Sequence, residues 1–214
     1  MKQLTFSGRT DSGVHACSQV VSFSSKFVIN SKALINHVNK HSMYLKINDF
    51  SCADDDFNAR KSASFREYIY IFSDKPVPVY LSNYVTVINQ TVNISIVQEC
   101  LNFLIGTHDF NGFRKTGSNE NSTIRKIVSA KVEKFCYKVL TDSNKSIILN
   151  KVTIKGNAFL YRMIRNIMGS IFLILDKNNN LTPINFNQTI EQKKRVFDFK
   201  PAGPEGLFLN KIFY

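Results

Sequence analysis

The 214-residue chain is predicted to fold as an α+β protein built on a largely antiparallel sheet. Segments with alternating or β-branched residues recur along it, and they do not alternate strictly with the helical segments. Hydrophobic residues make up 43% of the chain, which is enough for a buried core in one or two domains. No internal repeat or low-complexity tract is evident.

The elements follow from periodicity and composition. Alternation and β-branched or aromatic content predict strands at 3–7, 17–23, 43–50, 64–72, 125–135, 146–155 and 207–213. Apolar residues at helical spacing predict helices at 31–40, 94–105, 158–175 and 188–197. Asn93 can cap the second helix and Gly106 can end it. Pro76 and Pro78 mark a break after the strand at 64–72, and the polar stretches 116–122 and 142–145 are expected to be turns.

Charge and cysteine content limit the classes of function. The formal net charge of +12 favours a polyanionic partner, because binding releases counterions. Lysine-rich surfaces also arise without such a partner, so charge alone leaves nucleic-acid binding open. The cysteines, at 17, 52, 100 and 136, form no C-x-x-C pair, which argues against a zinc site or a redox pair. No apolar run is long enough for a membrane span and no signal peptide is evident, so a cytoplasmic location is expected.

A glycine-bounded octet, Gly8-Arg9-Thr10-Asp11-Ser12-Gly13-Val14-His15, lies between two expected strands. Its two glycines allow a tight turn where a Cβ atom would clash. Asp11, held on this loop beside Arg9, is a candidate nucleophile or acid/base group. The alternative, which spacing alone favours, is a turn aspartate that bonds to its own backbone.

The octet resembles G-R-T-D-A-G-V-H, the active-site motif of the tRNA pseudouridine synthase A family, with Ser12 in place of the alanine. Further matches follow in the same order along the chain. The stretch 57–60 is similar to F-H-A-R, 66–70 to R-x-Y-x-Y, and 109–114 to D-F-x-x-F-R. The stretch 159–170 is similar to F-x-x-x-M-V-R-N-I-V-G-S, and 206–209 to G-L-Y-L. With matches along nearly its whole length, the chain is identified as a member of this family.

The resemblance implies two ferredoxin-like halves that form one continuous sheet with a central cleft. We assign residues 1–58 to the amino-terminal half, which carries the catalytic loop, and 59–214 to the carboxy-terminal half. The family has a further strand and helix before the octet, with the stretch D-G-x-x-Y-x-G-W-Q-R-Q. Here the octet begins seven residues after Met1 and the chain has no Trp. The amino-terminal half is therefore expected to be incomplete.

The resemblance also implies the reaction and its central residues. The family isomerises uridine to pseudouridine at positions 38, 39 and 40 of the tRNA anticodon stem-loop, acts as a homodimer, and needs no cofactor or metal. Asp11 corresponds to the nucleophile, and whether it attacks the sugar or the base stays open. Arg165 corresponds to the arginine that pairs with this carboxylate and keeps it ionised in a desolvated cleft. The alternative for Arg165 is a side chain that snorkels from a buried helix.

The family match assigns two further residues to the substrate base. Tyr68 corresponds to the tyrosine that stacks on the target uracil. Tyr70 lies on the same strand face, so periodicity does not choose between the two, and a core or cross-strand role is the common alternative. Leu207 corresponds to a residue packed near the base, and a plain core position is its alternative.

Basic residues supply the expected RNA contacts. The resemblance assigns Arg9 to holding the RNA, which suits guanidinium stacking and phosphate pairing. Arg60, Arg114 and Lys115 are candidate phosphate contacts, or else solvated surface charges.

Two other kinds of function stay open on sequence alone. The incomplete amino-terminal half leaves a catalytically inactive, tRNA-binding remnant as the main alternative, with a basic scaffold protein as a second. His37 and His41 are spaced like a metal-binding pair, but no third ligand is visible and no metal is predicted.

Overall fold

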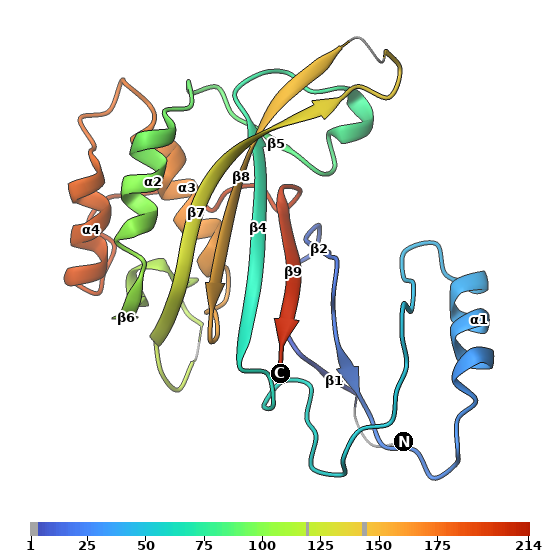
Figure 1. Cartoon of the computed structure of the whole chain (residues 1–214). Helices are drawn as coiled ribbons and strands as arrows, with labels where there is room; N and C mark the ends of the chain where they lie inside the picture. The colour runs from blue at the N-terminus through green and yellow to red at the C-terminus, as the bar shows by residue number, and fades with distance from the viewer. Residues whose placement is uncertain (1–3, 119, 143–144) are drawn as a thin grey trace.

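The computed structural model describes residues 4–118, 120–142 and 145–214 (Figure 1). Its strands are β1 (Thr5–Phe6), β2 (His15–Ala16), β3 (Val21–Ser22), β4 (Phe65–Ser73), β5 (Thr86–Val87), β6 (Gly106–Asp109), β7 (Ile124–Lys138), β8 (Ser146–Gly156) and β9 (Leu207–Phe213). Its helices are α1 (Ser31–His41), α2 (Ile94–Asn102), α3 (Met163–Ile174) and α4 (Pro183–Glu191). Short 3-10 turns lie at Val79–Leu81 and Asn111–Phe113.

A mostly antiparallel sheet forms the centre of the molecule, as predicted. Its strand order is β2-β9-β4-β8-β7-β6, and β5 pairs with β4. The pairs β2 with β9 and β4 with β5 are parallel, and the other pairs in this sheet are antiparallel. Strands β1 and β3 form a separate two-stranded sheet, so the described strands do not make the single continuous sheet that was expected.

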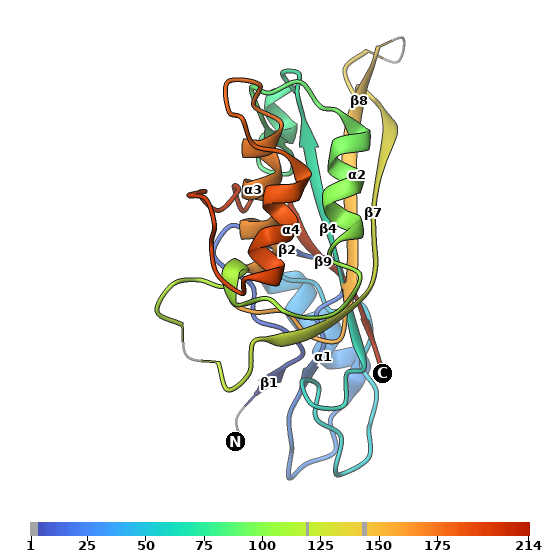
Figure 2. The same cartoon turned by 90° about the vertical axis from the view of Figure 1, so that its left-hand side faces the viewer.

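Three helices, α2, α3 and α4, cover one face of the large sheet (Figures 1 and 2). Along β4, alternate side chains are buried, including Tyr68, Tyr70 and Phe72. These side chains and the apolar residues of α3 belong to one core cluster, with Met163 and Ile167 of α3 fully buried. Burying each such side chain stabilises the fold by about 1.5–3 kcal/mol, so this layer holds α3 against the sheet.

The predicted ends of the helices α2 and α4 are only partly confirmed. Asn93 caps α2 as predicted, since its Oδ1 accepts hydrogen bonds from the amides of Ser95 and Ile96 at 3.0 and 3.4 Å. Gly106 does not end α2, because the helix stops at Asn102 and Gly106 opens β6. The prediction for α4 was wrong in its bounds: it begins at Pro183, after Thr182, and ends before the basic run at 193–195.

The segment 43–50, predicted as a strand, forms none. Its alternating residues have no described strand beside them, and a strand needs a partner for its backbone hydrogen bonds. Strands β2, β5 and β6 were not predicted, and the strands predicted at 3–7 and 17–23 are reduced to β1 and β3. Residue 3 of the first expected strand, residue 119 of the stretch 116–122 and residues 143–144 of the stretch 142–145 lie outside the described residues.

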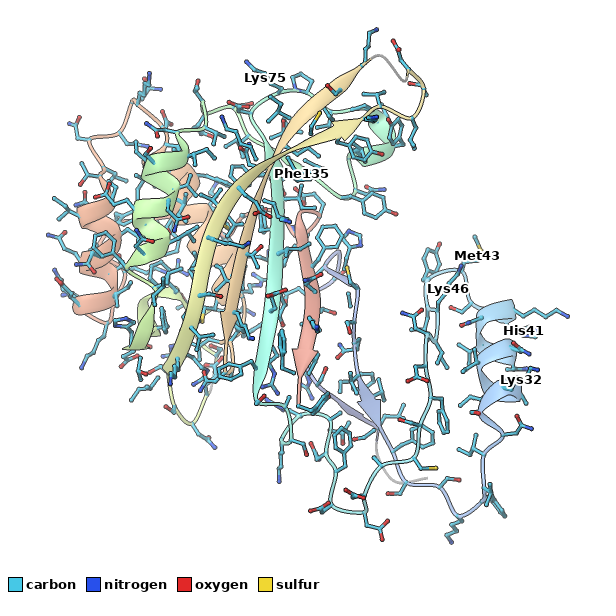
Figure 3. The ribbon with its side chains drawn as sticks, viewed as in Figure 1. Lys32, His41, Met43, Lys46, Lys75 and Phe135 are labelled. Carbon is cyan, nitrogen blue, oxygen red and sulfur yellow. The ribbon has the colours of Figure 1, made fainter. Side chains whose placement is uncertain are left out.

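Helix α1 lies apart from the large sheet (Figure 1), and none of its residues is buried. Figure 3 shows Lys32, His41, Met43 and Lys46 on this part of the chain, away from the β4–β9 strands. Among the residues that the structure describes, every helix is too short or too polar to cross a bilayer.

Helix α3 packs directly against the backbone of residues 200–203. A Cβ atom on Gly169 would lie 1.9 Å from the carbonyl oxygen of Lys200 and 3.0 Å from the amide nitrogen of Ala202. The amide of Ala202 donates a hydrogen bond of 2.8 Å to the carbonyl oxygen of Arg165, one turn earlier on α3. Because residue 169 is glycine, residues 200–203 can lie close enough to α3 to form this hydrogen bond.

Substituting Gly169→Ala is expected to reduce the free energy of unfolding by about 1–3 kcal/mol, because the added methyl group forces the two backbones apart. The thermal midpoint, followed by circular dichroism, should fall by roughly 5 °C. Gly8→Ala is the matched control, since its Cβ would meet Tyr68 Oη at 3.5 Å, an ordinary contact. Equal midpoints for the Gly169 variant and the parent chain would contradict the close packing.

Candidate active site

The glycine-bounded octet forms a tight loop between β1 and β2. The amide of Val14 donates to the carbonyl oxygen of Asp11 at 3.1 Å, which closes a turn over residues 11–14. Gly13 has a φ of 81°, a conformation that residues with a Cβ rarely adopt. A Cβ there would also lie 2.9 Å from Cγ of Pro204. The turn therefore sets the position of Asp11 against the segment that precedes β9.

The side chain of Gln19 forms hydrogen bonds that fix the start of this loop. Its Nε2 donates to the carbonyl oxygen of Gly8 at 2.6 Å, and its Oε1 accepts from the Gly8 amide at 3.3 Å and from Ser7 Oγ at 2.6 Å. One amide thus satisfies both backbone groups of Gly8. Sequence reasoning missed Gln19; its signal was a polar side chain inside an expected strand.

Arg66, on β4, ties the loop to the rest of the site. Its guanidinium donates to the carbonyl oxygens of Ser7 at 3.2 Å, Asn157 at 2.6 Å and Ala63 at 3.1 Å, and also to that of Arg60. Burial lowers the pKa of this guanidinium. Arg66 therefore joins the loop, the start of β4 and the approach to α3, a role that no sequence pattern indicated.

The structure brings Asp11 and Arg165 together, although they are 154 positions apart in the sequence. Arg165 Nη1 donates to Asp11 Oδ2 at 2.9 Å, and Arg165 Nε donates to the carbonyl oxygen of Ala202 at 2.8 Å. The side chain of Arg165 is 12% exposed and that of Asp11 is 15% exposed, so the ion pair is shielded from water on most sides. The contact excludes free snorkelling for Arg165, since the backbone fixes its guanidinium against the carboxylate.

A second arginine approaches the same carboxylate oxygen. Arg162, the residue just before α3, places its Nε 3.8 Å from Asp11 Oδ2. Its backbone is left-handed, with φ 60° and ψ 10°. Both cation contacts reach Oδ2, and within the described ranges Oδ1 of Asp11 accepts no hydrogen bond. One carboxylate oxygen is therefore held, and the other is available to a substrate.

Tyr68 and Tyr70, which periodicity could not separate, differ in the structure. Tyr70 Oη bonds to Thr86 Oγ1 at 2.7 Å and donates to the carbonyl oxygen of Gly203 at 2.8 Å, as a core side chain does. Tyr68 packs edge-on against Phe159, with ring centroids 5.0 Å apart. Burial raises the pKa of Tyr68 to about 12, with the nearby charges of Arg66 and Asp11 acting in opposite directions.

Tyr68 also borders the catalytic loop. A Cβ built on Gly8 would lie 3.5 Å from Tyr68 Oη and 3.7 Å from Cδ2 of Leu209. Leu207, the residue expected near the base, is 6% exposed and pairs with Tyr70 in the sheet. Leu207 is therefore buried in the core of the sheet, and its place near the base stays a prediction.

The predicted RNA-contacting arginines lie in different settings. Arg9 is exposed on the loop itself, two residues before Asp11. Arg60 is exposed at the start of the segment that Arg66 holds. Arg114 is partly covered: its Nη1 donates to the carbonyl oxygen of Ser118 and lies 3.6 Å from Glu120 Oε2. Arg9 and Arg60 thus have freer side chains than Arg114.

His37 and His41 stack on α1, with ring centroids 4.5 Å apart. Among the described residues, no group of three or more His, Cys, Asp and Glu side chains is arranged to hold a metal ion.

Comparisons with known proteins show which family the chain belongs to. A family model described as tRNA pseudouridine synthase matches residues 101–214, which include Arg165. The chain is 34% identical to tRNA pseudouridine synthase A of Bdellovibrio bacteriovorus, over 97% of its own length and 77% of the relative's. It is 33% identical to the protein of the same name from Borrelia hermsii, over 97% and 80% of the two lengths. The protein of that name from Colwellia psychrerythraea is 30% identical, over 99% and 78%.

The family match over more than half of the chain and the relatives aligned along nearly all of it lead to one assignment. The chain belongs to the tRNA pseudouridine synthase family.

Proposed function

We propose that this isomerase converts uridine to pseudouridine in the anticodon stem-loop of tRNA, at positions 38, 39 and 40, with Asp11 as the nucleophile. Family membership establishes the reaction class, and the net charge of +12 suits an RNA substrate. The observation that carries the proposal is the Asp11–Arg165 ion pair on a loop closed by Gly13. A homodimer in the cytoplasm is the form we propose for the active protein.

The reaction is an isomerisation, so its atoms and electrons balance without a co-reactant. The bond between C1′ and N1 of uracil breaks, and a bond between C1′ and C5 forms. N1 gains a proton and C5 loses one. The chain must therefore supply a nucleophile, hold the detached base and exclude water, which are tasks for side chains alone.

Arg165 holds the Asp11 carboxylate in place, and Asp11 supplies the nucleophilic oxygen. The Arg165 guanidinium holds Oδ2 and supplies the opposite charge that a carboxylate needs when a bound nucleotide displaces water. Oδ1 is then the oxygen that faces the substrate. The hydrogen bond from Arg165 to the Ala202 carbonyl keeps the guanidinium in place when the nucleotide enters.

The remaining roles follow from exposure and packing. Tyr68 lies beside the loop and is proposed to contact the target base, and its hydroxyl stays protonated well into the alkaline range because burial raises its pKa to about 12. Arg9 and Arg60 are proposed phosphate contacts, and Arg114 a further one at the rim. Leu207 is proposed to support the strand that carries Tyr68 from within the core.

Replacing Asp11→Asn should abolish pseudouridine formation, with a loss of about 10³-fold or more, while tRNA binding stays close to that of the parent chain. The amide keeps an oxygen for Arg165 but is no longer a nucleophile. The assay is release of label from C5-tritiated uridine in tRNA, alongside filter binding. Product formation by the Asn variant would overturn the assignment, and a parent chain that binds tRNA without product would be a binding protein only.

Substituting Arg165→Lys keeps the charge but loses the planar fork that contacts Asp11 and Ala202 together. We expect the single-turnover rate to fall by about 10–100-fold, and Arg165→Gln to lower it further. Tight tRNA binding should remain in the Lys variant. Rates for both variants that equal the parent rate would show that the ion pair plays no part in the reaction.

The raised pKa of Tyr68 predicts how stability changes in alkali. The unfolded chain releases this proton near the ordinary value of 10, whereas the folded chain holds it to about 12. The free energy of unfolding should therefore fall as pH rises from 10 to 12, and less steeply in Tyr68→Phe. Urea unfolding at several pH values measures this, with Tyr44→Phe, at a fully exposed site, as the control. Identical slopes for Tyr68→Phe and the parent would contradict the burial of this hydroxyl.

A further inference from the structure

Tyr161 is an exposed aromatic side chain that precedes Arg162, the residue whose Nε lies 3.8 Å from Asp11 Oδ2, and the proposed function gives it no role. Its side chain lies on the short segment between β8 and α3 and is 42% exposed. Two cations approach its ring, with Lys115 Nζ 5.0 Å and Arg162 Cζ 5.5 Å from the ring centroid. A partly exposed aromatic ring with two positive charges close to it is the combination that single-stranded nucleic acids bind.

The backbone around Tyr161 is held in place. Its carbonyl oxygen accepts from the Lys115 amide at 3.0 Å, and its amide donates to Glu120 Oε1 at 3.3 Å. Ser118 Oγ is within 2.8 Å of Glu120 Oε2 and 2.7 Å of the Lys115 carbonyl oxygen. Glu120 is thus occupied in holding the loop, and Lys115 Nζ forms no ion pair with a described residue.

Arg162 links this ring to the catalytic carboxylate. Its Nε is buried, has no hydrogen-bond partner among the described residues, and lies 3.8 Å from Asp11 Oδ2. Its left-handed backbone is strained for a residue with a side chain, and the surrounding structure must maintain that conformation. A strained residue with an unused donor beside a nucleophile points to a contact that forms when substrate binds.

We propose that Tyr161, Lys115 and Arg162 form a subsite for the nucleotide next to the target uridine in the RNA. The neighbouring base stacks on the Tyr161 ring, and the phosphates on its two sides pair with Lys115 and Arg162. Stacking tolerates any base, so the subsite places the target uridine at Asp11 without reading its neighbours. This inference rests on the proposed function and adds a second anchor to the same site.

The test measures RNA binding in the Asp11→Asn background, where no product forms. The RNAs are an intact anticodon stem-loop and two versions that lack the base on the 5′ or the 3′ side of the target uridine. Tyr161→Leu should weaken binding of the intact RNA by about tenfold. With one of the two abasic RNAs the same substitution should cause no further loss, since its stacking partner is gone.

Two controls separate stacking from general damage. Tyr161→Phe keeps the ring and should bind within about twofold of its Asp11→Asn parent, while Tyr44→Leu, at a fully exposed site beyond α1, should change nothing. Lys115→Gln and Arg162→Gln should each reduce the salt dependence of binding by about one released ion. Lys75→Gln, a cation at the far end of β4 (Figure 3), should leave it unchanged.

Equal losses for Tyr161→Leu with all three RNAs, or no loss with the intact RNA, would overturn the subsite. If Tyr161→Leu fails to fold, the salt dependence of RNA binding by Lys115→Gln and Arg162→Gln is the deciding measurement. A salt dependence equal to that of the Lys75→Gln control would then overturn the subsite. A different observation would show that the proposed function is wrong, namely pseudouridine formed by the Asp11→Asn chain.

Discussion

The contact between Asp11 and Arg165 is the interaction on which the rest of this structure depends. It joins a loop near one end of the sequence to the first turn of a helix 154 residues later. A partly buried carboxylate beside a partly buried guanidinium is stable only when each has further partners, because an unpaired charge in such a place is costly. The further partner of Arg165 is the carbonyl oxygen of Ala202, and that of Asp11 is Arg162.

Backbone carbonyls perform much of the positioning around this pair. Arg66 donates to carbonyl oxygens from separate segments, and Gln19 satisfies both backbone groups of Gly8. Such contacts fix where loops lie without creating any pattern in the local sequence. They explain why the octet can carry a reactive side chain and still remain rigid.

Regular periodicity made a large part of the fold predictable. The strands β4, β7, β8 and β9 and the helices α1 and α2 lie close to the predicted ranges, since their apolar residues repeat at strand or helix spacing. Helix α3 was predicted from residue 158 but begins at Met163, after the left-handed Arg162. The segment 43–50 has the same alternation but no described partner strand, and pairing is decided by distant residues that spacing does not reveal. Helix α4 begins at Pro183, before the predicted start at residue 188, because Thr182 and a proline at the first helical position form its start.

The sequence predicted those site residues that belong to a recognised motif. The octet and the stretch 159–170 indicated Asp11 and Arg165, but no pattern indicated that Arg162 would approach the same oxygen. A motif match assigns Leu207 to the neighbourhood of the base, and the sheet register buries this residue opposite Tyr70. Residues that act through geometry between distant segments, such as Arg66 and Arg162, become visible only in three dimensions.

The most direct measurement is a structure of the Asp11→Asn chain bound to an anticodon stem-loop. The account predicts that the target uridine is flipped out of the stem, with its glycosidic carbon or its base about 3–3.5 Å from one side-chain atom of residue 11. Arg165 should remain on the other side-chain atom. A target nucleotide seated away from residue 11, or a guanidinium that has left it, would contradict the account.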